Sequence, residues 1–235
     1  MGDGGLSMGV AYHAHRMNSK LETLYLGPSI KDLANKQTKD YGIEEVKNVS
    51  NLAEKCARLL AEGKIFAIAR GRMEWGPRAL GNRSIICLAT NREIVESLNS
   101  KLGRNDFMPF APMCREVDAQ KYFHLNLPID NYKYMTITTD VTEYCREKAK
   151  AVVHVDNTAR PQVVYQTDNT FIYEVLSEVH AINQNAILVN TSFNIHEEPI
   201  VCTEIEAVET FKKSKIDYLI INDSLYSNLE LNSQY

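Results

Sequence analysis

Hydrophobic residues recur every three or four positions in four segments of the chain, which is the spacing of one helical face. The segments are 51–63, 90–103, 172–179 and 203–211. Three of them begin with a polar residue that has glutamate three positions later, a pattern typical of a helix N-terminus; these residues are Asn51, Thr90 and Thr203. We therefore predict an amphipathic helix in each segment, with Gly63 and Gly103 ending the first two.

Short apolar runs alternate with these helices and predict buried strands. They lie at 65–69, 152–155, 186–189 and 218–221, with a less regular run at 132–135. Because strands and helices alternate but irregular stretches separate them, we expect an α/β (α+β) domain with a mixed sheet flanked by helices. Residues 27–50 are polar and predict a connecting arm with at most one short helix.

Composition places the chain among ordinary globular proteins, since 44% of its 235 residues are hydrophobic and 24% are charged. The net charge of -4 disfavours a broad surface for nucleic acid or anionic membrane. No apolar run approaches the ~20 residues of a membrane span. The five cysteines are scattered without a C-x-x-C pair, which favours reduced core thiols in a cytoplasmic protein. We expect neither nucleic acid nor membrane among its partners.

The run 70–83 concentrates positive charge in an unusual form. It holds Arg70, Arg72, Arg78 and Arg83, contains no lysine, and is interrupted by three glycines that would let its backbone approach a ligand. Guanidinium groups pair bidentately with phosphate and carboxylate, whereas an ammonium acts as a point charge. We interpret the run as an anion pocket for phosphate. The alternative is a solvated loop whose arginines pair with nearby carboxylates.

Three polar clusters follow predicted strands: the arginine run, residues 156–162 and residues 190–194. Ligands gather at strand carboxyl ends in open α/β sheets, so we expect the clusters to converge on one pocket. Neutral donors and acceptors in the last cluster suit phosphate, ribose or an amide, although Asn-Thr-Ser also forms ordinary turns. Glu74 and Asp156 could orient arginines or accept hydrogen bonds from N–H donors. The six histidines are scattered, which disfavours metal binding by this chain alone.

Five stretches in order along the chain resemble the C-terminal domain of the NodU/CmcH/TobZ O-carbamoyltransferases. They are 71–85 (GRMEWGPRALGNRSI), 108–112 (MPFAP), 156–162 (DNTARPQ), 190–194 (NTSFN) and 198–201 (EPIV). The resemblance implies a YrdC-like fold for residues 51–235, which would use carbamoyl phosphate and ATP to make carbamoyl adenylate and pyrophosphate. An ASKHA-type domain would then pass the carbamoyl group to a hydroxyl-bearing small molecule.

The resemblance also implies residue roles. Arg72, Arg78 and Arg83 would clamp phosphates as catalytic residues, and Lys101, Arg104, Asp156 and Arg160 would bind the substrate. Glu74, Ser84, Asn190, Thr191, Ser192 and Asn194 would line the nucleotide, which Mg²⁺ accompanies. Residues 1–23 resemble the tail of the ASKHA-type domain, joined through the arm 24–50. Asp3 would help to hold iron or another divalent metal in the full-length protein.

The sequence departs from the family pattern in several places. Met108 stands where members often carry Arg, Glu197 stands where they often carry Gly, and the K-x-R-E motif is replaced by Lys101-Leu-Gly-Arg104. The paired histidines of the first domain are absent, so we expect only a partial reaction from this chain. A non-catalytic nucleotide-binding or RNA-binding YrdC-like module is the alternative, and a homodimer is left open.

Overall fold

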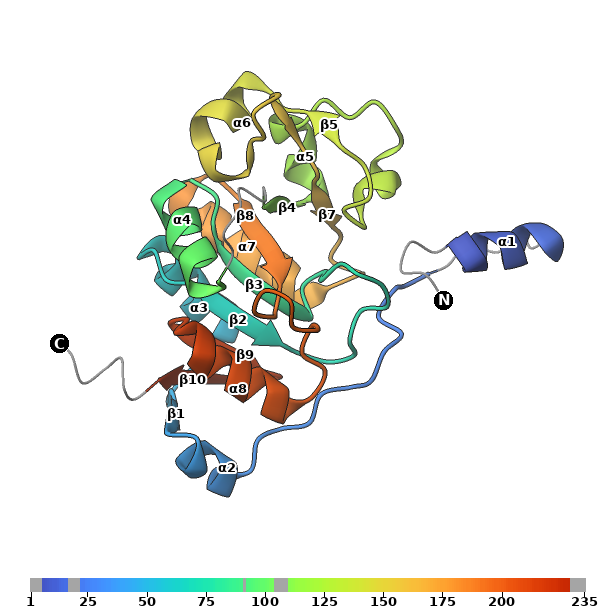
Figure 1. Cartoon of the computed structure of the whole chain (residues 1–235). Coiled ribbons are helices and arrows are strands. Elements are labelled where there is room, and N and C mark those ends of the chain that lie inside the picture. The colour runs from blue at the N-terminus through green and yellow to red at the C-terminus, as the bar shows by residue number, and fades with distance from the viewer. Residues whose placement is uncertain (1–5, 17–21, 91, 104–109, 229–235) are drawn as a thin grey trace.

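An eight-stranded mixed sheet forms the centre of the protein (Figure 1). The computed structural model describes residues 6–16, 22–90, 92–103 and 110–228. In spatial order, the strands are β1 (Ile43–Glu45), β10 (Ser224–Asn228), β9 (Tyr218–Ile221), β2 (Phe66–Ala69), β3 (Arg83–Leu88), β8 (Ile187–Ser192), β4 (Ala111–Arg115) and β7 (Gln162–Val164). The pairs β2–β9 and β4–β7 are parallel and the others are antiparallel. The predicted mixed sheet is therefore confirmed.

Helices cover both faces of this sheet. Along β2, Phe66 and Ile68 pack with α3 (Leu52–Ala61) and α7 (Thr170–Asn183), while Ala67 and Ala69 face the opposite side. That opposite side carries α4 (Arg92–Lys101), α5 (Ala119–Tyr122), α6 (Glu143–Lys148) and α8 (Glu204–Ser214). Strand side chains alternate between the faces, so each short apolar run contributes to two hydrophobic layers.

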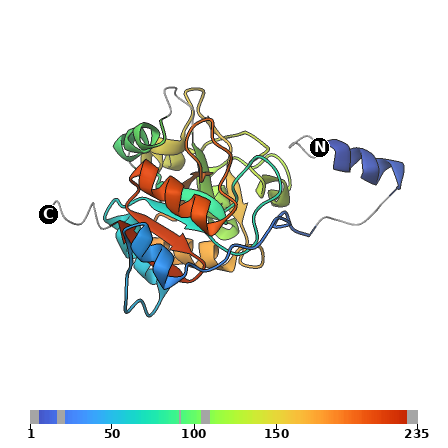
Figure 2. The same ribbon diagram turned by 60° about the horizontal axis from the view of Figure 1, so that its bottom comes forward.

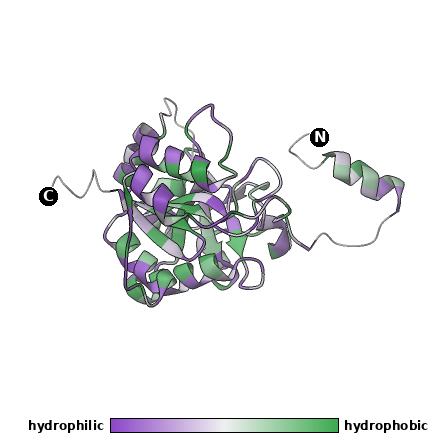
Figure 3. Ribbon diagram, turned by 90° about the horizontal axis from the view of Figure 1, so that it is seen from below, coloured by the Kyte–Doolittle hydropathy of each residue, from purple (hydrophilic) through white to green (hydrophobic). Residues whose placement is uncertain are grey.

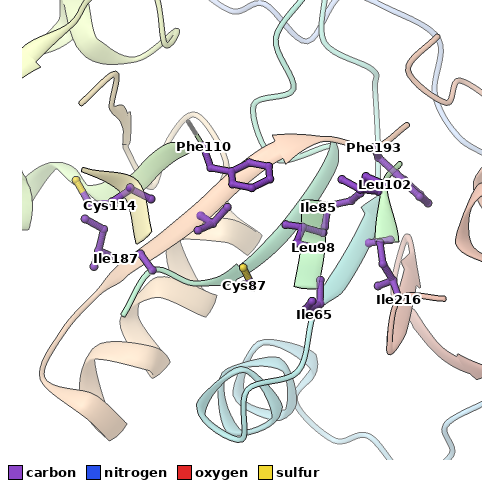
Figure 4. Close-up of a cluster of buried hydrophobic side chains, with 14 of the residues drawn as sticks. Ile65, Ile85, Cys87, Leu98, Leu102, Phe110, Cys114, Ile187, Phe193 and Ile216 are labelled. Atoms are coloured by element: carbon purple, nitrogen blue, oxygen red, sulfur yellow. The ribbon is translucent and has the colours of Figure 1, made fainter. Parts of the chain in front are cut away.

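The layer beneath α4 and α8 is the larger of the two. Figure 4 shows part of it, including Ile85 and Cys87 of β3, Ile187 of β8 and Leu98 of α4. Cys87 is a free thiol without solvent exposure, and its burial raises its pKa to about 12. Cys56, Cys114 and Cys145 are also buried free thiols, as expected for core residues. Hydrophobic and hydrophilic residues alternate along the helices in Figure 3, as expected for helices with one buried face.

The predicted helix starts agree with the structure at two caps. Asn51 caps α3, because its side chain accepts a hydrogen bond from the Glu54 amide at 3.2 Å. Thr203 and Glu206 form a reciprocal capping box at the start of α8. These ends depend on residues three positions apart, which is why a local sequence pattern predicts them.

Two predicted strands are wrong. The run 132–135 begins at the last residue of a 3₁₀ helix, η2 (Ile129–Tyr132), and the run 152–155 begins at the last residue of another, η3 (Lys150–Val152). Tyr132 and Val152 are nevertheless buried in the larger hydrophobic layer. Val155, in contrast, is fully exposed. Short turns can bury apolar residues as well as strands can, so a short apolar run alone does not predict a strand.

The segment before α3 contains more structure than expected. It holds α2 (Asn35–Asp40) and also β1, which pairs with β10 at the edge of the sheet. A small separate sheet joins β5 (Thr139–Asp140) to β6 (Thr158–Ala159). Helix α1 (Leu6–Ala14) has no buried residue and stands apart from the body (Figure 2). None of the helices in the described ranges is long and apolar enough to cross a membrane.

Candidate anion-binding site

One edge of the sheet brings the polar clusters together. Strands β2 and β8 are each antiparallel to β3, which lies between them, so both end at the same edge. Strand β4 begins there, because Ala111 pairs with Asn190, and β7 begins beside it, because Gln162 pairs with Met113. The arginine run after β2, the segment before β7 and the end of β8 therefore meet at this edge.

A cavity of about 110 Å³ lies at that edge. Arg78 of the arginine run, Arg160 before β7 and the end of β8 contribute to its wall. The lining residues are Pro77, Arg78, Ala79, Phe110, Ala111, Met135, Arg160, Asn190, Thr191 and Ser192. All three polar clusters contribute, which agrees with the predicted convergence. The second cluster, residues 156–162, reaches the cavity for a reason that was not predicted. It lies there because it leads into the start of β7, and not because it follows the end of a strand.

The charges of the cavity favour an anion. Arg78 is exposed and Arg160 is half-buried, and neither guanidinium has an ion-pair partner among the described residues. Burial, and secondly the positive charge of Arg78, lower the pKa of Arg160. Two unpaired guanidinium groups at one cavity repel each other, and a bound phosphate or carboxylate would relieve that repulsion.

The end of β8 supplies polar groups to the wall. Asn190 is 1% exposed, and its Nδ2 donates to the Ala79 carbonyl at 2.9 Å and to Gln162 Oε1 at 2.7 Å. Ser192 Oγ donates to Asn194 Oδ1 at 2.5 Å. Asn194 in turn donates from Nδ2 to the Ile195 and Glu198 carbonyls, so it shapes the loop after β8 and does not line the cavity.

Glu74 and Arg83 support the arginine run from inside. Glu74 is buried, and its Oε1 accepts from the amides of Leu80, Asn82 and Arg83 at 2.6, 2.8 and 3.2 Å. This burial raises the pKa of Glu74. Arg83 is fully buried and donates to main-chain carbonyls, including those of Arg70 and Asn82. Both side chains therefore hold the backbone that carries Arg78.

Two further residues of the run have structural partners. Ser84 is buried, and its Oγ accepts from the Gly81 amide at 2.8 Å. Gly81 has φ +116°, and an added Cβ there would lie 2.8 Å from Ile172 Cγ1, so the close packing requires glycine. Arg70 pairs with Asp223 at 2.5 Å and stacks over the Phe171 ring at 4.2 Å. Arg70 therefore fits the alternative interpretation of a surface arginine paired with a carboxylate.

The connecting arm lies against the arginine run. Arg72 donates from Nη2 to the Leu26 carbonyl at 2.6 Å and from Nε to the Gly27 carbonyl at 3.1 Å. The Gly27 amide donates to the Met73 carbonyl at 2.9 Å, and the Trp75 amide donates to the Leu24 carbonyl at 2.7 Å. Arg72 therefore fastens the arm to the run and does not line the cavity.

The remaining predicted site residues lie elsewhere. Lys101 Nζ donates to the Lys215 carbonyl at 2.5 Å, beside the end of α8. Asp156 is exposed and accepts from the Thr158 amide and hydroxyl; these hydrogen bonds lower its pKa. Neither residue lines the cavity. Arg104, Met108 and Asp3 lie outside the described residues.

The sequence assigned no individual role to three contributors, although Gln162 belongs to the predicted cluster 156–162. Gln162 orients Asn190, while Phe110 and Met135 line the cavity. Met135 has φ +51°, a conformation that is uncommon for a residue with a side chain and that occurs at functional sites. Gln162 was detectable as a polar residue opening an apolar run, Gln-Val-Val. Among the described residues, no three His, Cys, Asp or Glu side chains gather so as to hold a metal ion.

Comparison with known proteins identifies the family. Residues 57–228, most of the chain, match the family model described as the carbamoyltransferase C-terminus. The chain belongs to this family. The arginine run, the cavity and the end of β8 all lie within the matched residues of this carbamoyltransferase C-terminal domain.

Relatives of the carbamoyltransferase C-terminal domain occur in longer proteins. The uncharacterized protein MJ1051 of Methanocaldococcus jannaschii is 35% identical over 98% of the chain and 46% of its own length. Nodulation protein NolNO of Sinorhizobium fredii is 35% identical over 88% of the chain and 31% of its length. The 3'-hydroxymethylcephem-O-carbamoyltransferase of Streptomyces clavuligerus is 33% identical over 72% of the chain and 32% of its own length. The chain thus spans less than half the length of these curated relatives.

Solved structures confirm the predicted YrdC-like fold. Full-length HypF in its phosphate- and nucleotide-bound form aligns with a TM-score of 0.55 and 24% identity, covering 73% of the chain and 25% of HypF. Sua5 of P. abyssi complexed with L-threonine aligns with a TM-score of 0.53 and 13% identity, covering 72% of the chain and 46% of Sua5. At these identities, the likeness concerns the fold alone.

Proposed function

We propose that this domain activates carbamoyl phosphate with ATP to form carbamoyl adenylate. The observation that carries the proposal is the cavity where Arg78 and Arg160 meet the end of β8, in a chain of the carbamoyltransferase family. The HypF structure described as phosphate- and nucleotide-bound has the same fold and supports a site for such ligands. The carbamoyl group would finally pass to a hydroxyl-bearing small molecule.

The reaction consists of two displacements at phosphorus, each of which breaks one P–O bond and forms another. Carbamoyl phosphate transfers its phosphoryl group to water, which leaves carbamate and inorganic phosphate. A carbamate oxygen then attacks the α-phosphorus of ATP in line, and pyrophosphate leaves with the electron pair of the broken P–O bond. No covalent intermediate with the protein is needed, so positioning and charge neutralisation should account for the rate enhancement.

Each group in the cavity has a place in this proposal. Arg78 and Arg160 neutralise the oxygens of carbamoyl phosphate and later those of the attacked phosphate. Ser192 Oγ, whose proton is directed to Asn194, presents its lone pairs to a donor such as a ribose hydroxyl, and Thr191 lies beside it in the cavity wall at the end of β8. Glu74, Arg83 and Ser84 act as positioning residues that hold the arginine run. Mg²⁺ would arrive with the ATP phosphates, which supply most of its ligands in such complexes.

Replacing Arg78 tests the proposal. Arg78→Lys exchanges a two-pronged donor for a point charge, and removing one donor aimed at developing charge typically lowers the rate by about 10²–10³. We expect that loss in carbamoyl-phosphate-dependent exchange between ATP and pyrophosphate. Arg70→Lys is the matched control, because Arg70 belongs to the same run but pairs with Asp223.

Two outcomes would count against the proposal. Exchange by Arg78→Lys within threefold of the parent protein, with an unchanged melting temperature, would remove Arg78 from the site. ATP affinity that is the same with and without carbamoyl phosphate would favour the alternative, a module that binds nucleotide without catalysis.

A further inference from the structure

The amide of Asn190 has one fixed orientation. Its Nδ2 donates to the Ala79 carbonyl, a main-chain oxygen that can only accept, so the nitrogen must lie on that side. Its second acceptor, Gln162 Oε1, is fixed in turn because Gln162 Nε2 donates to the Leu80 carbonyl at 2.8 Å. Two main-chain carbonyls therefore determine where Asn190 Oδ1 lies, and the usual ambiguity of amide assignment is removed.

Asn190 Oδ1 is a buried acceptor that has no partner among the described residues. Only 1% of the residue is exposed, and it lies in the wall of the cavity. Buried polar atoms in native proteins nearly always have hydrogen-bond partners, since an unpaired one loses its hydration without compensation. The missing partner is a donor, because a carbonyl oxygen can only accept.

The rest of the cavity defines the ligand that carries this donor. Arg78 and Arg160 select anionic oxygens, and Asn190, a third residue of the wall, has a buried Oδ1 that requires an N–H or O–H donor. The cavity of about 110 Å³ is far below the ~300–1,000 Å³ of pockets for drug-sized ligands. A small molecule with anionic oxygens at one end and an amide NH₂ at the other fits these three conditions.

We propose that Asn190 is a specificity residue whose Oδ1 accepts a hydrogen bond from the NH₂ of the carbamoyl group. This inference rests on the proposed function, and it moves Asn190 from the nucleotide to the carbamoyl side of the site. The site then distinguishes carbamoyl phosphate from acyl phosphates in which a methyl group replaces NH₂. Gln162 is a positioning residue that acts through Asn190.

Acetyl phosphate is the matched probe, because it differs from carbamoyl phosphate by CH₃ in place of NH₂. A buried partner left unpaired corresponds to about 5- to 150-fold in affinity, so we expect the parent protein to prefer carbamoyl phosphate by that factor. Asn190→Ala should reduce the preference to below about threefold while inorganic phosphate still binds through the two arginines. Calorimetric titration of the whole chain with each compound measures these ratios.

Two more variants separate specificity from stability. Gln162→Met leaves Asn190 Oδ1 in place but removes the group that fixes its amide, so the preference should fall partway. Asn185→Ala removes a buried asparagine that bonds Tyr122 and the Lys148 carbonyl, outside the cavity, and should keep the full preference.

The outcomes distinguish this inference from the function on which it rests. Equal binding of carbamoyl and acetyl phosphate by the parent protein overturns the inference, and that measurement needs no variant to fold. A preference that survives in folded Asn190→Ala also overturns it, and a loss of ATP affinity alone would return Asn190 to the nucleotide. Failure of inorganic phosphate to bind the parent protein would overturn the anion site itself.

Discussion

Arg70, Arg72, Arg78 and Arg83 carry the same side chain, yet their guanidinium groups have four different environments. Arg70 pairs with a carboxylate, Arg72 bonds the connecting arm and Arg83 is buried among carbonyls. Only Arg78 of these four lines the cavity. Positive charge in the sequence therefore indicates an anion site, but a residue's neighbours decide whether its charge is available to a ligand.

Ser192 tests the same distinction between structure and ligand binding. Its hydroxyl proton is directed to Asn194, which leaves the Oγ lone pairs in the cavity wall for a donor, such as the ribose hydroxyl of the nucleotide. Ser192→Ala should weaken ATP binding by about two-fold to more than a hundred-fold, corresponding to roughly 0.5–3 kcal/mol. Calorimetric titration measures this, with thermal unfolding as the control. Unchanged affinity in a folded variant would show that Ser192 is only a turn residue.

Glu197 occupies a backbone conformation that favours glycine. Its φ is +67° and its side chain is exposed, so the residue bears the steric cost of the left-handed region. That cost is about 1–2 kcal/mol, and the freer unfolded chain of a glycine variant offsets about 0.4–1 kcal/mol of the gain. Glu197→Gly should therefore raise the free energy of unfolding by up to about 1.5 kcal/mol in urea titrations. A clear decrease in the free energy of unfolding would contradict the conclusion that Glu197 bears this steric cost.

At the scale of elements, the arm and the arginine run behave as one unit. Hydrogen bonds in both directions join Gly27 and Trp75 to the opposite segment, and Arg72 bonds the arm carbonyls. The arm passes along the body between α1 and α2 (Figures 1 and 2). The position of Arg78 therefore depends on a segment that precedes the sheet in the chain.

Gly27→Ala tests this dependence. An added Cβ would lie 2.9 Å from both the Cβ and the carbonyl oxygen of Met73, so the arm has to move. We expect a lower melting temperature and weaker phosphate binding at the cavity. Gly9→Ala in α1 is the matched control, because an added Cβ meets nothing within 4 Å there. If Gly27→Ala and Gly9→Ala have the same melting temperature and the same affinity for phosphate, the arm does not position the arginine run.

At the scale of the whole molecule, the prediction concerns the division of the reaction. The chain spans 46% of MJ1051 and smaller fractions of the other relatives reported, and the paired histidines expected for acceptor transfer are absent from it. A protein with this 235-residue sequence should form carbamoyl adenylate but carbamoylate no hydroxyl compound. Mass spectrometry of sugar and antibiotic acceptors, with a full-length relative as positive control, checks this. Robust O-carbamoylation by the 235 residues would refute it.

The sequence by itself determined the elements whose signals are local. Helices α3 and α8 follow from caps within three residues, and α7 follows from one apolar stripe. Strands β2, β8 and β9 follow from continuous apolar runs between polar segments. The arginine-and-glycine run likewise indicated an anion site, because guanidinium chemistry and backbone freedom are properties of the residues themselves.

Tertiary structure decided which elements pair and which polar groups reach the cavity. Strand β4 was missed because Pro112 argues against a central strand, yet Pro112 pairs in register with Val189. Arg83 was predicted to bind phosphate, but it donates to the Cys202 carbonyl, 119 residues away. Gln162 and Asn190 meet across 28 residues. Such partners are brought together by packing of the sheet, and a pattern within a few residues of the chain contains no information about them.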